Sequence, residues 1–393
     1  MNQKEILIHN AHIYTEKRDW MPGWMVISDT KIRLMGAGSL PDFPADQFTR
    51  IIDAQGKTLL PGFIDPHAHG AVGQEAMDAN ADGLRKMAVF YAQHGVTSFV
   101  PTTWTARADA VNKVLDCVSK TMGPIKNGAK ILGVYLEGPY LNSIRSGAQD
   151  ASLIHLADKK EVLQFLESGI VRLIAIAPEF SENLWLIDEC VRRGIIVSIG
   201  HSAANYEQVR IAVQHGVTHA THTYNAMTPL GHRELGTVGA VMAFPEINCE
   251  LISDNIHVHP AAQKILIDTK GTDGVILVTD SIRGTGLPDG DYPIDNRTIT
   301  IKDGAARLPD GSLAGSTLTM ERALRNSLTA SGRSLKEIWP VSSLNAARDL
   351  GITANKGSLE IGKDADLVLL SENFEVIMTI VEGLIIFDRD AKN

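Results

Sequence analysis

The sequence predicts an α/β protein: a (β/α)8 TIM-like barrel joined to a small β-sandwich domain built from both termini. The middle of the chain alternates eight apolar, strand-like runs with helix-like segments, which is the pattern of a parallel barrel. The first 60 and the last 40 residues instead contain short β-like runs. We therefore expect the barrel at residues 61–352 and the small domain at residues 1–60 and 353–393.

Both termini show the short apolar runs and tight turns that are typical of β strands. The runs lie at residues 6–14, 25–28, 31–35, 366–370, 375–381 and 384–387. Glu382 and Gly383 supply a tight turn between the last two runs. Two β-rich ends around a different middle indicate one domain to which both ends contribute.

In the middle, the strand-like runs begin near residues 61, 96, 130, 171, 195, 217, 247 and 274. Helix-like segments fill most of the gaps, for example 82–94, 109–121, 156–167 and 183–193. The sequence Gln-His-Gly-Val-Thr occurs twice, each time where a helix ends and a strand begins. We assign its histidines, His94 and His215, to helix ends, where the helix dipole favours positive charge. A β-hairpin insertion is expected at 286–307.

The composition is that of an ordinary globular protein, with 44% hydrophobic and 21% charged residues among 393. Acidic residues outnumber basic ones, 46 to 37, so the formal net charge is −9. This balance argues against a nucleic-acid partner and against binding to an anionic membrane surface. It is compatible with a small anionic substrate, because a few local arginines can hold one phosphate.

The cysteines and the N-terminal segment indicate a cytoplasmic protein. Cys117, Cys190 and Cys249 form no C-x-x-C pair, so neither a cysteine zinc site nor a disulfide scaffold is expected. The N-terminal segment lacks the apolar core of a signal peptide, and no run of about 18 apolar residues occurs. We therefore expect no membrane contact.

Polar residues that a buried strand does not need stand at the ends of the predicted barrel strands. They are His67, His69, Glu137, His201, His222, His257 and Asp280. In a barrel the C-terminal strand ends form one mouth, so these imidazoles and carboxylates should converge there. Nitrogen and oxygen donors of this kind suit a divalent first-row metal such as Zn, Fe, Mn or Co.

A single histidine at a strand end is more often a hydrogen-bonded core residue than a ligand. The joint pattern over at least five strands is much harder to attribute to packing. Structural roles are assigned to His9, His12, His155 and His219, whereas His259 is ambiguous because it follows His257 by two residues. The chain has neither a phosphate-binding G-x-x-x-x-G-K-[ST] loop nor a G-x-S-x-G elbow, so we expect no ATP, NAD or FAD.

Several motifs resemble the amidohydrolase superfamily. The resemblance lies in PGFIDPHAHG at 61–70, in GSLEIGKDADL at 357–367, and in the ordered series His-x-His, Glu, His, His, Asp. Within that superfamily, the chain is similar to the N-acetylglucosamine-6-phosphate deacetylases. YLEGPYLN around Glu137, HTYNAM at 222–227, VTDS at 278–281 and LAGS at 313–316 indicate this group, and the resemblance covers nearly the whole chain.

The resemblance implies a role for each matched position. Glu137, His201 and His222 match the family's constant metal site, and His67 and His69 match a second metal position that some members lack. Asp280 matches the catalytic acid/base. Substrate contacts are implied for Ala148, Gln149, Asn225, Ala226, Arg233, His257, Leu313, Ala314 and Gly315, with Arg233 as the charge partner of the phosphate.

The resemblance also implies the reaction. One or two divalent metals per subunit and a small-molecule amino sugar phosphate substrate are expected, in a homodimer. N-acetylglucosamine-6-phosphate would be hydrolysed to acetate and glucosamine-6-phosphate, with Asp280 moving a proton from the attacking water to the leaving amine. Gln149 or His257 would help to stabilise the oxyanion.

One matched position departs from the family, which usually has a histidine where this chain has Gln149. Glutamine donates a neutral hydrogen bond, and charge-assisted bonds are roughly twice as strong. Alternative substrates therefore stay open: N-acetylgalactosamine-6-phosphate, an unphosphorylated N-acetylamino sugar or another cyclic amide. The non-enzyme alternative is a scaffold that has lost its metal, but this chain keeps every expected ligand.

Overall fold

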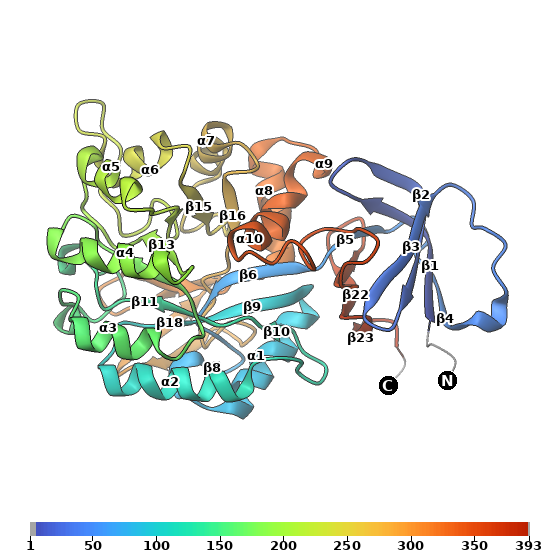
Figure 1. Ribbon diagram of the computed structural model, residues 1–393, viewed down its shortest axis with the longest axis horizontal. Helices are drawn as coiled ribbons and strands as arrows, with labels where there is room; N and C mark the ends of the chain where they lie inside the picture. The colour runs from blue at the N-terminus through green and yellow to red at the C-terminus, as the bar shows by residue number, and fades with distance from the viewer. Residues whose placement is uncertain (1–4, 392–393) are drawn as a thin grey trace.

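The computed structural model describes residues 5–391 and contains a parallel barrel beside a separate terminal sheet (Figure 1). The barrel occupies the left of the figure, and the terminal sheet lies on the right. Within residues 5–391, no helix has the length and apolar character needed to cross a membrane.

Eight parallel strands form the barrel, which confirms the predicted fold class. In spatial order they are β6 (Phe63–Ala68), β9 (Val96–Thr103), β11 (Val134–Glu137), β12 (Val171–Ile176), β13 (Ile196–Ile199), β14 (His219–Ala220), β15 (Asn248–Leu251) and β16 (Val275–Leu277). Ser281 pairs with Ala68 in parallel register, so the ring is nearly closed. The short β10 (Lys130–Ile131) extends the sheet beside β9. Every residue of β9 is buried, as expected of strands covered on both faces.

Helices follow most of the strands and cover the outside of the barrel. They are α1 (Ala81–Gln93), α2 (Ala108–Thr121), α3 (Lys159–Leu166), α4 (Leu184–Arg192), α5 (Tyr206–Gln214), α6 (Gly236–Ala243), α7 (Pro260–Lys270), α8 (Met320–Ser331), α9 (Leu335–Ile338) and α10 (Leu344–Asp349). Short 3-10 helices lie at Ala45–Gln47, Ala76–Asp78, Ser143–Arg145, Ala151–Leu153, Ser181–Asn183 and Trp339–Ser342.

The repeated Gln-His-Gly-Val-Thr segments end α1 and α5, as the sequence predicts. Each histidine is followed by a glycine with positive φ, 80° at Gly95 and 104° at Gly216. The His94 imidazole contacts Glu321 at 2.8 Å, and the His215 imidazole contacts Asp188 at 2.7 Å. These contacts fit the structural role that the sequence suggested for both histidines.

Strands from both termini share one sheet in the order β23-β22-β21-β5-β1-β2-β3, with β4 also paired to β1. Their bounds are β1 (Glu5–Tyr14), β2 (Asp19–Ser28), β3 (Lys31–Ala37), β4 (Phe48–Asp53), β5 (Thr58–Pro61), β21 (Leu367–Leu370), β22 (Val376–Val381) and β23 (Leu384–Asp388). Ile8, Ile52 and Leu369 belong to an apolar core separate from that of the barrel. The domain limits at 60 and 353 stay a prediction.

A further antiparallel sheet follows the last barrel strand. It contains β17 (Gly290–Ile294), β18 (Arg297–Lys302), β19 (Ala305–Arg307) and β20 (Leu313–Ser316) in that order. The sequence predicted only a hairpin over 286–307, so the insertion is larger than expected. The extra strand β20 returns to the barrel, because Ser316 pairs with Ser281. A small hairpin of β7 (Gly70–Ala71) and β8 (Gln74–Glu75) follows β6.

Candidate active site

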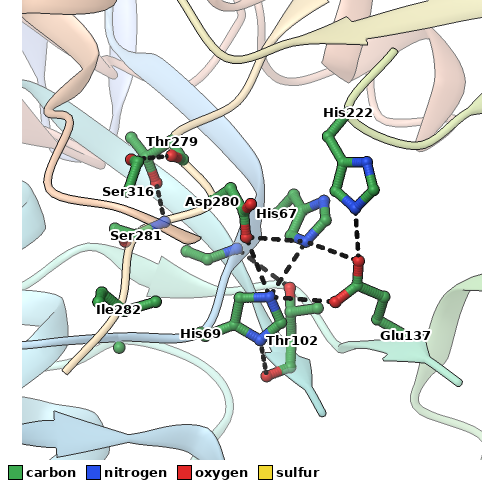
Figure 2. A network of polar contacts seen from close by, with 12 residues as sticks. His67, His69, Thr102, Glu137, His222, Thr279, Asp280, Ser281, Ile282 and Ser316 are labelled. Atoms are coloured by element: carbon green, nitrogen blue, oxygen red, sulfur yellow. Dashed lines mark hydrogen bonds and ion pairs between the residues drawn. The ribbon is translucent and has the colours of Figure 1, made fainter. Parts of the chain in front are cut away.

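The structure brings six of the predicted polar residues together at the C-terminal ends of the strands, and Figure 2 labels five of them, all but His201. They are His67, His69, Glu137, His201, His222 and Asp280, and all six are buried. They come from β6 and β11 and from the turns that follow β6, β13, β14 and β16. We refer to these six residues as the cluster.

Glu137, His201 and His222 form the first triad of the cluster. The Glu137 Oε1 atom lies 3.1 Å from His201 Nε2 and 2.9 Å from His222 Nε2. The two Nε2 atoms are themselves 3.1 Å apart. Three lone-pair donors from three strand ends thus face one small space.

His67, His69 and Asp280 form the second triad. The Asp280 Oδ1 atom lies 3.1 Å from His69 Nε2 and 3.4 Å from His67 Nε2. Glu137 joins the two triads, because its Oε2 atom is 3.2 Å from His69 Nε2 (Figure 2).

The outer nitrogens of three cluster imidazoles have acceptors. His201 Nδ1 donates to the Arg145 carbonyl at 2.9 Å, and His69 Nδ1 donates to the Thr102 carbonyl at 3.2 Å. His67 Nδ1 donates to the Glu250 carboxylate at 2.9 Å. An Nδ1 atom that donates outward leaves the Nε2 lone pair facing the interior of the cluster, as in metal-ligating histidines.

The electrostatics of the cluster favour added positive charge. Burial raises the pKa of Glu137, but its contacts with His201, His222 and His69 outweigh burial and hold it well below its usual range. Burial lowers the pKa of His69, yet the Asp280 and Glu137 carboxylates raise it to about 10. A cluster that holds protons this strongly also offers a divalent cation favourable binding. The donor set and the direction of the Nε2 lone pairs therefore fit a metal ion.

A cavity of about 210 Å³ opens onto the cluster. Beside Glu137, His201, His222 and Asp280, its lining includes seven of the predicted substrate contacts: Ala148, Gln149, Asn225, Ala226, His257, Leu313 and Gly315. His257 is held by Asp254, whose Oδ2 atom lies 2.7 Å from His257 Nδ1. The cavity thus joins the cluster to most of the residues that the sequence placed around a substrate.

Two predicted substrate contacts lie outside this lining. Ala314 is buried in the apolar core beneath the inserted sheet. Arg233 is exposed on the loop between β14 and α6. No lysine or arginine is among the residues that line the cavity.

Gln149 has both ends of its amide engaged within the protein. Its Nε2 atom donates to Glu137 Oε2 at 2.7 Å, and its Oε1 atom accepts from the Thr105 backbone N–H at 2.6 Å. The sequence suggested a hydrogen bond from this amide to the substrate. In the structure the amide instead supports the carboxylate that joins the two triads.

The sequence did not point to three residues that lie beside the cluster. Thr102 and Glu250 accept the hydrogen bonds described above, and the Trp104 ring stacks on His69 with ring centroids 3.8 Å apart. The available signal for Glu250 was an acidic residue inside the apolar run that begins near 247. Thr102 acts through its backbone carbonyl, which no side-chain pattern reveals.

The fold and the site together define a class of protein: a (β/α)8 barrel with histidines and carboxylates at its mouth that could hold a metal ion. Residues 58–386 match the amidohydrolase family. The chain belongs to this family, whose members are metal-dependent.

The chain is also similar to individual known proteins over most of its length. The chain is 39% identical to the N-acetylglucosamine-6-phosphate deacetylase of Lysinibacillus sphaericus over 85% of this chain and 87% of that protein. It is 36% identical to the enzyme of the same name from Bacillus subtilis (strain 168), over 98% of both chains. A solved mutant of the Mycobacterium smegmatis deacetylase, in complex with N-acetyl-D-glucosamine-6-phosphate, superposes with a TM-score of 0.91 at 30% identity, over 98% of this chain and 99% of that chain.

Proposed function

We propose that this protein hydrolyses the N-acetyl amide of N-acetylglucosamine-6-phosphate to acetate and glucosamine-6-phosphate. The observation that carries the proposal is the cluster at the base of a cavity whose lining contains the acid/base candidate Asp280. The similarity to deacetylases of this substrate over nearly the whole chain supports the same reaction.

Glu137, His201 and His222 would hold one divalent metal, and His67, His69 and Asp280 would hold a second. The candidates are Zn, Fe, Mn and Co, which all accept imidazole and carboxylate ligands. A metal in this position supplies Lewis-acid polarisation of the amide carbonyl and lowers the pKa of a water molecule.

Asp280 carries the proton. Burial raises the pKa of this carboxyl, but His67 and His69 outweigh burial and lower it, so Asp280 is ionised at neutral pH and can accept a proton. It takes one from water as the new C–O bond forms at the acetyl carbon. It then protonates the sugar nitrogen as the C–N bond breaks. The products are acetate and the free amine.

The substrate lies in the cavity in this proposal. Asn225, Ala226 and His257 contact the sugar, and Leu313 closes over it. Arg233 is the charge partner of the phosphate. The protein acts in the cytoplasm as a homodimer.

A substrate panel tests the proposed activity. Acetate release is measured for N-acetylglucosamine-6-phosphate, N-acetylgalactosamine-6-phosphate, plain N-acetylglucosamine and a cyclic amide, with chelated and metal-reconstituted protein. The gluco 6-phosphate should give the highest kcat/KM, and chelation should abolish it. A preference for any other member of the panel assigns the activity to that substrate instead. A protein that binds no metal and releases no acetate contradicts the enzymatic function altogether.

A further inference from the structure

Glu250 on β15 is a fully buried carboxylate that contacts both triads. Its Oε2 atom accepts a hydrogen bond from His67 Nδ1 at 2.9 Å and another from the backbone N–H of His222 at 3.0 Å. Its Oε1 atom is buried without a hydrogen-bond partner. Burying a carboxylate is unfavourable unless its contacts compensate, so this position calls for an explanation.

The hydrogen-bond partner of His67 Nδ1 is of a different chemical kind from those of the other cluster histidines. His69 and His201 donate their Nδ1 protons to neutral backbone carbonyls. His222 Nδ1 is buried without a partner. Within residues 5–391, His67 is thus the only cluster imidazole whose Nδ1 atom meets a carboxylate. A carboxylate in that place fixes the tautomer and makes the opposite nitrogen a stronger ligand.

We propose that Glu250 is the positioning residue of the second metal position, the one formed by His67, His69 and Asp280. Glu250 holds His67 with its Nε2 lone pair toward Asp280 and Glu137, and strengthens that nitrogen as a donor. Through the His222 amide, it also ties the second position to the backbone of the first triad. The inference rests on the proposed metal-dependent function and adds a residue outside the ligand set.

Asp349 offers a matched control. Its side chain is 16% exposed, accepts hydrogen bonds from Asn248, and lies 3.2 Å from the Nδ1 atom of a buried imidazole, His219. His219 is on β14, but it contributes no atom to the cluster. Replacing Asp349 therefore removes a partly buried carboxylate beside an imidazole without touching either metal position.

The experiment compares wild type, Glu250→Gln and Asp349→Asn. Metal-free proteins are titrated with zinc ion in equilibrium dialysis, and bound metal is counted by elemental analysis. Wild type and Asp349→Asn should each bind two zinc ions with matching affinities. Glu250→Gln should keep the first equivalent and bind the second about 10- to 100-fold more weakly, which is the usual effect of losing such a partner. Thermal melting of the metal-free proteins monitors the fold.

Three results would overturn the inference. The first is wild-type affinity for both equivalents in Glu250→Gln. The second is equal weakening of both equivalents with a lower melting temperature of the metal-free protein, which indicates a structural role. The third is a wild type that binds one zinc at every concentration; acetate release by that same sample would still uphold the proposed function.

If Glu250→Gln fails to fold, Glu250→Asp takes its place, because it keeps the charge but shortens the reach to His67. It should also lose affinity only for the second equivalent, and unchanged binding there would count against Glu250.

Discussion

Three residues of the cluster stand on left-handed backbone, where residues other than glycine are uncommon. The φ angles are 48° at His201, 28° at His222 and 48° at Asp280. Such a conformation costs about 1–3 kcal/mol per residue and persists only where neighbouring structure imposes it. At Asp280 the neighbours are clear: its N–H donates to the His67 carbonyl, and its carbonyl accepts from Ser316. Adjacent strands, rather than local preference, therefore set the geometry of the site.

Asp280→Asn should abolish turnover while the first triad keeps its metal. Asparagine is nearly isosteric, but it cannot take a proton from water at neutral pH, and general acid–base catalysis contributes roughly 10²- to 10⁴-fold. The check is kcat, measured together with metal content in the same sample. Activity within about threefold of wild type would show that another group moves the proton.

Gln149→Leu should weaken metal binding at Glu137. The leucine removes the donor that lies 2.7 Å from Glu137 Oε2, and loss of such a supporting contact lowers metal affinity by about 10- to 100-fold. Metal content after dialysis and KM are measured together. Full metal content with a raised KM would contradict this expectation and return Gln149 to the substrate-contact role that the sequence suggested.

Strand β20 lies directly against the strand end that carries Asp280. A Cβ atom at Gly315 would lie 2.8 Å from the Asp280 carbonyl oxygen and 2.3 Å from an Ile282 methyl carbon, and Gly315 has φ +56°. No side chain fits at this position without moving Asp280 or β20. The inserted sheet thus takes part in placing Asp280, the proposed acid/base.

Gly315→Ala should therefore reduce both stability and kcat. Gly311→Ala is the control, because Gly311 has φ +88° but its Cβ would meet nothing within 4 Å. The control should lose only about 1 kcal/mol to left-handed strain and keep its kcat. Urea unfolding and steady-state kinetics on both variants make the comparison. Equal kcat in the two variants would mean that the β20 contact does not position Asp280.

The loop between β14 and α6 carries Arg233, which we expect to recognise the phosphate. Arg233→Ala should raise KM for the 6-phosphate sugar far more than for the plain sugar, with kcat nearly unchanged. A hydrogen bond to a charged group contributes about 1.5–3 kcal/mol, which is roughly 10- to 150-fold in KM. Equal effects on the two sugars would remove Arg233 from phosphate binding.

Ion pairs around Lys356 hold the segment 356–382 together, and one partly exposed pair reaches the barrel sheet. The Lys356 Nζ atom lies 2.5 Å from Asp366, 3.0 Å from Asp364 and 3.4 Å from Glu382. The Glu382 carboxylate also forms an ion pair with Lys130 of β10, at 2.5 Å. Burial lowers the pKa of Lys356, but Asp366 and Asp364 outweigh burial and raise it, so the ammonium is charged in the fold.

Lys356→Met should destabilise the whole molecule by about 3–5 kcal/mol, because it leaves the buried Asp366 carboxylate without its cation. Lys113→Met is the control. Lys113 is 73% exposed and, among residues 5–391, forms an ion pair with Asp109 alone, so its loss should change stability by less than about 1 kcal/mol. Urea unfolding midpoints report the difference. A Lys356→Met unfolding midpoint equal to that of the control would show that the ion-pair network does not stabilise the fold.

The sequence by itself determined the barrel, the shared terminal sheet and the identity of the cluster. Strand-to-helix alternation and the position of each polar residue at a strand end are local properties of the chain. A parallel barrel then brings all the strand ends to one mouth. Positions at strand ends therefore predict that side chains far apart in the sequence lie close together. His67, Glu137 and Asp280 could be grouped on this reasoning before any contact was known.

Only the tertiary structure decided which distant group each side chain meets. Alternation tells which face a residue occupies, but the partner depends on register between strands far apart in sequence. Glu250 reaches His67 across 183 positions, and Gln149 turns to Glu137 rather than to the cavity alone. Loops that cross the barrel mouth bring β20 back to Asp280 and leave Arg233 exposed. No periodic pattern in the sequence encodes the path of these loops.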